Sequence, residues 1–86
     1  MSQALPAITG KQLIRLLRRD GWTEVRRVRH GIAFTKAGPG ERQRITIVPG
    51  KRSVLPSGTL AAILSPKQSG IGREGLAALL AQHGLK

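Results

Sequence analysis

The stretch that decides the fold is residues 9–22, TGKQLIRLLRRDGW, which has the pattern of one short amphipathic helix. Thr9 and Gln12 have the T-x-x-Q spacing of a capping box, in which each side chain binds the free backbone N–H of the other residue. Gly21 predicts a left-handed stop at the other end. Between these signals an apolar stripe recurs at helical spacing, and it consists of Leu13, Ile14, Leu16 and Leu17.

A second face of the same predicted helix is basic. Lys11, Arg15 and Arg18 follow one another at spacings of four and three residues, so they share one side of the helix. A row of cations is typical of a nucleic-acid footprint. The same row is also compatible with a solvated helix face, and the sequence leaves both interpretations open.

The chain then changes to strand periodicity. Residues 22–29 and 30–36 are rich in β-branched and aromatic types, and residues 42–48 alternate between two faces. Gly-Pro-Gly at residues 38–40 is a turn signal. We therefore predict a three-stranded antiparallel meander with one solvent-exposed face. The last strand carries Ile45 and Ile47 on one side and Arg44 and Thr46 on the other.

Two more helices are predicted towards the C-terminus. Ser57 is the expected N-cap of the first, which Pro66 ends or kinks, and Gly84 is the expected stop of the second. Their apolar positions are Leu60, Ile63 and Leu64, and then Leu76, Leu79 and Leu80. The predicted class is α+β: the order α-β-β-β-α, helices on one face of the sheet, and an extra C-terminal helix. We expect residues 1–8 to be a flexible lead-in and residues 9–86 to be one domain.

Composition excludes several function classes. In 86 residues, 15 Lys and Arg oppose 4 Asp and Glu, a net charge of +11 that favours a polyanionic partner, either nucleic acid or an acidic protein. With no cysteine, disulfides, cysteine-based zinc sites and thiolate nucleophiles are excluded. Scattered carboxylates argue against a two-metal nuclease. No apolar run is long enough for a membrane span and no signal peptide is visible, so we expect a soluble cytoplasmic protein without a metal or cofactor.

Two histidines are the candidates for proton transfer. His30 lies among arginines in RRVRHG, residues 26–31, and positive neighbours favour a neutral imidazole. Such a base is suited to removing the proton of a ribose 2′-hydroxyl, whose oxyanion attacks the adjacent phosphate without any metal. The alternative is a packed strand-end histidine that shares a face with Ile32 and Phe34. His83 suits a structural role in the last helical turn, and it is the other candidate acid.

The order of these motifs resembles the HicA toxins of HicAB toxin–antitoxin systems over about residues 9–80. The matching segments are LIRLLRRDGW at 13–22, VRHGIAF at 28–34, ITIVP at 45–49, KR at 51–52 and GTLAAIL at 58–64. The resemblance implies a double-stranded-RNA-binding-domain-like fold in a toxin of a type II system. It also implies an endoribonuclease that cleaves mRNA and halts translation, with His30 catalytic, and a HicB-like antitoxin that blocks the site. Val28 and Arg29 stand where the family has Gly and Ser.

Together these observations predict an RNA site without a metal. Its predicted phosphate contacts are Lys11, Arg15, Arg18, Arg27, Arg29, Arg44, Lys51 and Arg52. One alternative is a non-catalytic basic module that binds double-stranded RNA or DNA. The other is an interaction protein whose positive surface meets an acidic partner.

Overall fold

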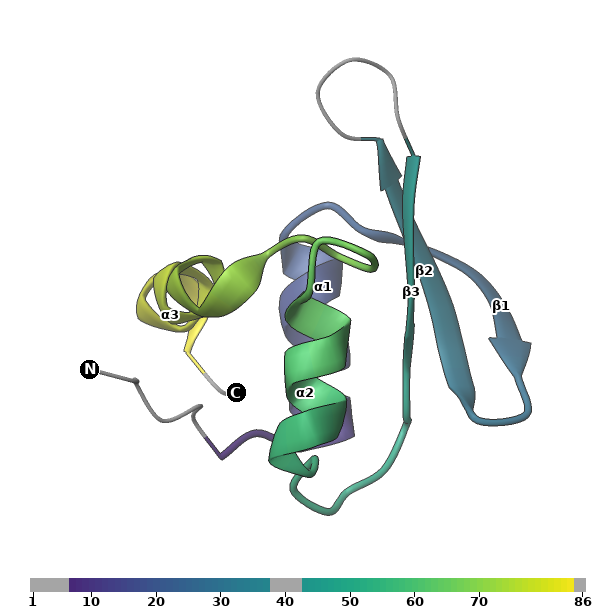
Figure 1. Cartoon of the computed structure of the whole chain (residues 1–86), viewed down its shortest axis with the longest axis horizontal. Coiled ribbons are helices and arrows are strands. Elements are labelled where there is room, and N and C mark those ends of the chain that lie inside the picture. The colour runs from purple at the N-terminus through teal and green to yellow at the C-terminus, as the bar shows by residue number, and fades with distance from the viewer. Residues whose placement is uncertain (1–6, 38–42, 85–86) are drawn as a thin grey trace.

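The computed structural model describes residues 7–37 and 43–84, which form three helices and a three-stranded sheet (Figure 1). The predicted α+β class and its α-β-β-β-α order with an extra C-terminal helix are confirmed. The predicted turn at residues 38–40 lies outside the described residues. In chain order the elements are α1 Gly10–Arg19, β1 Thr23–Val28, β2 Gly31–Ala37, β3 Gln43–Val48, α2 Ser57–Leu64 and α3 Gly72–His83.

Helix α1 begins and ends as its local sequence predicts. The Gln12 backbone N–H donates to Thr9 Oγ1 at 3.1 Å, and the Thr9 N–H donates to Gln12 Oε1 at 2.9 Å. Asp20 is the C-cap and Gly21 follows with a φ of 93°, a conformation that glycine adopts without a steric penalty. The apolar stripe of α1 is buried, and the basic residues lie on its exposed side.

The sheet has the order β1-β2-β3, and both pairs of strands are antiparallel. All three helices lie on one side of it, and no described element covers the other side (Figure 1). Phe34 of β2 and Val48 of β3 face the helices and are fully buried. The prediction of a meander with one solvent-exposed face is therefore confirmed.

Two details of the strands differ from the sequence prediction. Val28 pairs with Gly31, so Arg29 and His30 form a two-residue turn between β1 and β2. The prediction that His30 lies in the second strand is wrong, because the hairpin register leaves it outside the ladder. Trp22, the first residue of the predicted first strand, lies before β1 and is buried.

The alternation in β3 is confirmed, and Thr46 is on the side that faces the core. Thr46 is 1% exposed, whereas Ile45 is 58% and Ile47 is 43% exposed. Burial of a hydroxyl is tolerated when it is hydrogen-bonded, and Thr46 Oγ1 lies 2.8 Å from Gln68 Oε1. The two isoleucines consequently point away from the helices.

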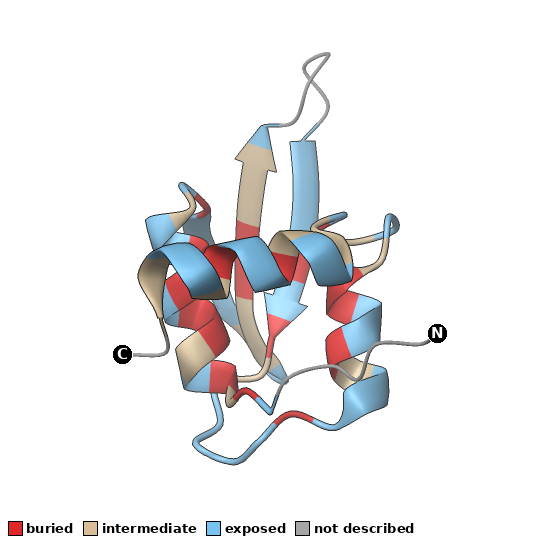
Figure 2. Cartoon of the chain, turned by 90° about the vertical axis from the view of Figure 1, so that its left-hand side faces the viewer, coloured by how far each residue is buried: buried red, intermediate tan, exposed pale blue. Residues whose placement is uncertain are grey.

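The core fills the space between the sheet and the helix layer, and Figure 2 shows buried residues along the inward sides of the helices. Helix α2 begins at Ser57, but the N-cap residue is Pro56 and no side chain caps the helix, so the predicted Ser57 cap is wrong. Helix α3 buries Leu76 and Leu79 and ends at Gly84, as predicted. Ile8, at the end of the expected lead-in, is fully buried.

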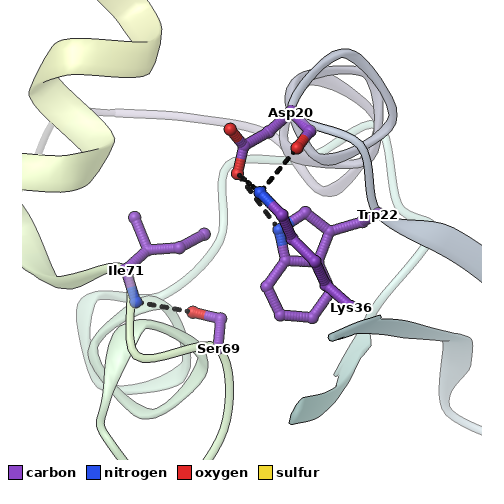
Figure 3. A network of polar contacts seen from close by, with 5 residues as sticks. All are labelled: Asp20, Trp22, Lys36, Ser69 and Ile71. Atoms are coloured by element: carbon purple, nitrogen blue, oxygen red, sulfur yellow. Dashed lines mark hydrogen bonds and ion pairs between the residues drawn. The ribbon is translucent and has the colours of Figure 1, made fainter. Parts of the chain in front are cut away.

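A polar network holds the end of α1 against β2 (Figure 3). Lys36 Nζ of β2 donates to the Asp20 carbonyl oxygen at 2.7 Å and to Asp20 Oδ2 at 3.1 Å. Trp22 Nε1 donates to the same Oδ2 at 3.2 Å. The Lys36 ammonium and the Trp22 indole, both bound to Asp20, fix the C-terminal end of α1 relative to the sheet. The basic face of α1 is thereby positioned beside β1.

Candidate nucleic-acid interface

A cleft with a volume of about 530 Å³ separates α1 from the β1–β2 hairpin. Helices α1 and α2 contact β3, whereas residues 23–27 of β1 are all exposed, so β1 extends beyond the helix layer. The walls of the cleft are basic and its floor is apolar. Cations come from both sides, namely Lys11, Arg15 and Arg18 from α1 and Arg27 from β1, and the floor contains Ile14, Val28 and Ile32.

A second hollow, of about 380 Å³, opens around the hairpin turn. Arg29 and His30 line it from the turn, and Lys51 lines it from the loop after β3. Gly31 and Gly50 line both hollows, so the two are adjacent. We call the combined surface the basic groove; its polar residues are Lys11, Arg15, Arg18, Arg27, Arg29, His30 and Lys51.

Two glycines allow the three segments around His30 to approach one another. A β-carbon on Gly31 would clash with the Val48 carbonyl oxygen and would lie 2.7 Å from the Val48 carbonyl carbon. A β-carbon on Gly10 would clash with the Pro49 carbonyl oxygen. The Lys11 backbone N–H donates to the Lys51 carbonyl oxygen at 3.1 Å. The start of α1, the hairpin turn and the loop at 49–51 therefore form one packed corner.

The electrostatic character of the groove is positive, with one ion pair on its wall. Arg18 Nη2 lies 2.7 Å from Glu24 Oε1, and the two side chains are 55% and 37% exposed. Exposed ion pairs contribute little to stability, so a phosphate group is able to compete with Glu24 for Arg18. Across residues 7–37 and 43–84 no group of three or more His, Asp or Glu side chains is placed to hold a metal ion.

His30 is exposed in its turn. The alternative interpretation, a histidine packed on the face of Ile32 and Phe34, is therefore wrong. The imidazole lines the groove next to Arg29 and opposite Lys51, where a bound polynucleotide has access to it. This arrangement places a group capable of proton transfer at one end of a row of cations.

Most of the predicted phosphate contacts lie together in the basic groove, and two do not. Arg52 is exposed in the same loop as Lys51 but lines neither hollow. Arg44 pairs with Lys36 at the far end of the β2–β3 ladder, and its Nη1 donates to the Pro66 carbonyl oxygen at 2.8 Å. Arg44 therefore connects the sheet to the α2–α3 segment.

His83 lies at the opposite end of α1 from His30. Its carbonyl oxygen accepts from Arg19 Nη1, at the C-terminal end of α1, at 3.0 Å. His30 lies beside the loop that packs on Gly10, at the start of α1. A ten-residue helix is roughly 15 Å long, so the two histidines do not share a site.

Sequence reasoning missed the apolar floor and the glycine corner. The His-Gly pair at residues 30–31 and the Pro-Gly pair at residues 49–50 were the available signals for the corner. The floor had no local signal, because Val28 and Ile32 are left partly exposed only when β1 extends beyond the helices. A nucleotide in the cleft would therefore meet apolar side chains below and cations on both sides.

Comparison with known proteins gives a family match over most of the described chain. The family model described as the HicA toxin of bacterial toxin–antitoxin systems matches residues 10–71. This segment contains the whole basic groove and stops just before α3. Neither the curated proteins nor the solved structures gave a match. None of the described helices is long and apolar enough to cross a membrane.

Proposed function

This chain belongs to the HicA toxin family of bacterial toxin–antitoxin systems, and we propose that it is a metal-independent endoribonuclease that cleaves mRNA in the cytoplasm. In this proposal cleavage inhibits translation, and a HicB-like antitoxin neutralises the enzyme. The observation that carries the proposal is the exposed His30 imidazole at the end of the basic groove. An imidazole is the side chain best suited to proton transfer near neutral pH.

The groove supports binding of an RNA strand by two kinds of contact. Arg15, Arg18 and Arg27 stand on its walls, where guanidinium groups bind phosphate oxygens in a planar, bidentate manner. Ile14 is almost fully buried, so the half-buried Val28 and Ile32 are the apolar part of the floor against which a sugar or base packs.

The proposed reaction takes place in the hollow around the hairpin turn. His30 removes the proton of a ribose 2′-hydroxyl, and the resulting oxygen attacks the adjacent phosphorus. The bond from phosphorus to the 5′-oxygen breaks, which leaves a 2′,3′-cyclic phosphate on one product and a 5′-hydroxyl on the other. Water supplies the proton to the departing oxygen, since His83 is remote. Arg29 and Lys51 stabilise the charge that develops on the phosphoryl oxygens.

The test is single-turnover cleavage of a long RNA by the wild type and by His30→Ala, each with and without a chelator. We expect His30→Ala to lower the cleavage rate by at least roughly 100-fold and to leave RNA binding intact. We expect the chelator to have no effect on cleavage. His83→Ala is the matched control and should cleave as the wild type does. Equal rates for the wild type and His30→Ala, or complete loss of cleavage with the chelator, would contradict the proposal.

A non-catalytic module that binds double-stranded RNA or DNA is the second candidate. It is favoured by the cations of the groove, which bind phosphates whether or not His30 reacts. This candidate predicts salt-sensitive binding by the wild type and intact RNA after long incubation. That pair of results would replace the nuclease proposal.

A further inference from the structure

The side of the sheet that faces away from the helices is uncovered by any described element (Figure 1), and it carries exposed apolar side chains. Its register rows are Thr23–Thr35–Ile45 and Arg26–Ala33–Ile47, and a bulge places Val25 beside Arg26. Val25, Ile45 and Ile47 are 56%, 58% and 43% exposed. We call this surface, made of Val25, Arg26, Ala33, Thr35, Ile45 and Ile47, the outer sheet face.

A buried hydroxyl on this face lacks a partner. Among the described residues, Thr35 Oγ1 is buried without a hydrogen bond. A buried polar atom is normally paired, so each exception calls for an explanation. Thr35 lies in the row between Thr23 and Ile45, close to the two exposed isoleucines. Exposed apolar side chains that are grouped on one face are typical of a surface that a partner covers.

The chemistry of the outer sheet face selects the kind of partner. RNA binds through phosphates, and this face offers β-branched side chains with Arg26 as the cation that the register places on it. A second copy of the chain carries the same net charge of +11, which opposes self-association. An acidic protein with apolar side chains at the centre of its surface fits both the isoleucines and the charge.

We infer that the outer sheet face is the docking surface of the antitoxin, an acidic protein chain that buries Ile45 and Ile47. The inference rests on the toxin–antitoxin assignment, and it adds an anchor that is separate from the basic groove. The face reaches the hairpin turn, because the Val28–Gly31 row closes the same ladder. A partner anchored on the isoleucines therefore lies next to Arg29 and His30 without needing any groove residue as its anchor.

The experiment is a calorimetric titration of the chain with the antitoxin encoded beside it. Ile45→Glu and the milder Ile45→Ser are compared with Val54→Glu, a matched control that is 55% exposed in the wild type and lies outside the sheet. We expect Ile45→Glu to raise the Kd at least roughly tenfold, Ile45→Ser to raise it less, and Val54→Glu to leave it unchanged. Thermal unfolding of each variant verifies that it is folded.

Several results would overturn the inference. One is wild-type affinity in Ile45→Glu, and another is an equal loss of affinity in Val54→Glu. If the wild type sediments as a dimer and Ile45→Glu sediments as a monomer, the face belongs to a second copy of the chain. Absence of any antitoxin gene beside this one would also refute the inference. RNA cleavage by the free chains is measured separately. A free wild-type chain that does not cleave RNA would refute the nuclease proposal, independently of the affinities measured in the titration.

Discussion

The salt dependence of RNA binding is the most quantitative consequence of the basic groove. Six cations line it: Lys11, Arg15, Arg18 and Arg27 in the cleft, and Arg29 and Lys51 in the second hollow. Each phosphate neutralised on a single strand contributes roughly −0.7 to the slope of log K against log salt. Full engagement of the groove therefore predicts a slope of roughly −4, or roughly a 300-fold loss of affinity between 50 and 200 mM salt.

Removal of one cation should change this slope by a defined amount. Arg15→Gln removes one phosphate contact, so the slope should become shallower by roughly 0.7 and the loss over the same salt range should fall to roughly 130-fold. The matched control is Lys67→Gln, because Lys67 is an exposed cation between α2 and α3 and lies outside the groove. Lys67→Gln should keep the wild-type slope.

The assay is fluorescence anisotropy of a labelled single-stranded RNA, measured at five or more salt concentrations. All chains carry His30→Ala, so that cleavage does not change the probe. Two results would refute the reasoning. One is a slope shallower than roughly −1, and the other is an equal change of slope in Arg15→Gln and Lys67→Gln, which would mean that net charge rather than the groove determines binding.

Three further substitutions test other parts of the structure. Glu24→Gln removes the carboxylate that holds one groove guanidinium, so RNA affinity should rise by roughly two- to fivefold in the same anisotropy assay; an unchanged Kd would mean that this guanidinium does not bind RNA. Gly31→Ala forces a β-carbon into the end of β3 and should cost about 1–3 kcal/mol in the free energy of unfolding. Its control, Gly58→Ala, meets no atom within 4 Å and should stabilise by about 0.5 kcal/mol; denaturant titration measures both, and equal effects would contradict the close approach. Leu76→Ala empties a fully buried site of α3 and should cost about 2–5 kcal/mol; a cost below about 1 kcal/mol would show that α3 is not part of the core.

Local sequence signals predicted the elements whose structure depends on residues close by in the sequence. The capping box of Thr9 and Gln12 and the stop at Gly21 define α1 in the structure as they do in the sequence. The alternation of β3 was equally local. Which of its two faces meets the helices is a tertiary property, however. The register pairs Thr46 with the buried Phe34, and Gln68 provides the partner for the buried Thr46 hydroxyl.

The candidate site was predictable in its residue types and only partly in its geometry. Arg15 and Arg18 could be assigned to one helix face from their spacing alone. The position of His30 could not, because one residue of hairpin register decides whether it lies on a strand face or in a turn. Arg44 was indistinguishable in sequence from the groove arginines, and only the register with Lys36 places it at the far end of the sheet.

The chemical ends of the RNA products test the central claim most directly. Abstraction of the 2′-hydroxyl proton by His30 predicts a 2′,3′-cyclic phosphate and a 5′-hydroxyl, detected by mass spectrometry of the fragments from a defined RNA. The same fragments should form at least roughly 100-fold more slowly with His30→Ala. Products with a 3′-hydroxyl and a 5′-phosphate, or cyclic phosphate ends produced at an undiminished rate by His30→Ala, would contradict the account.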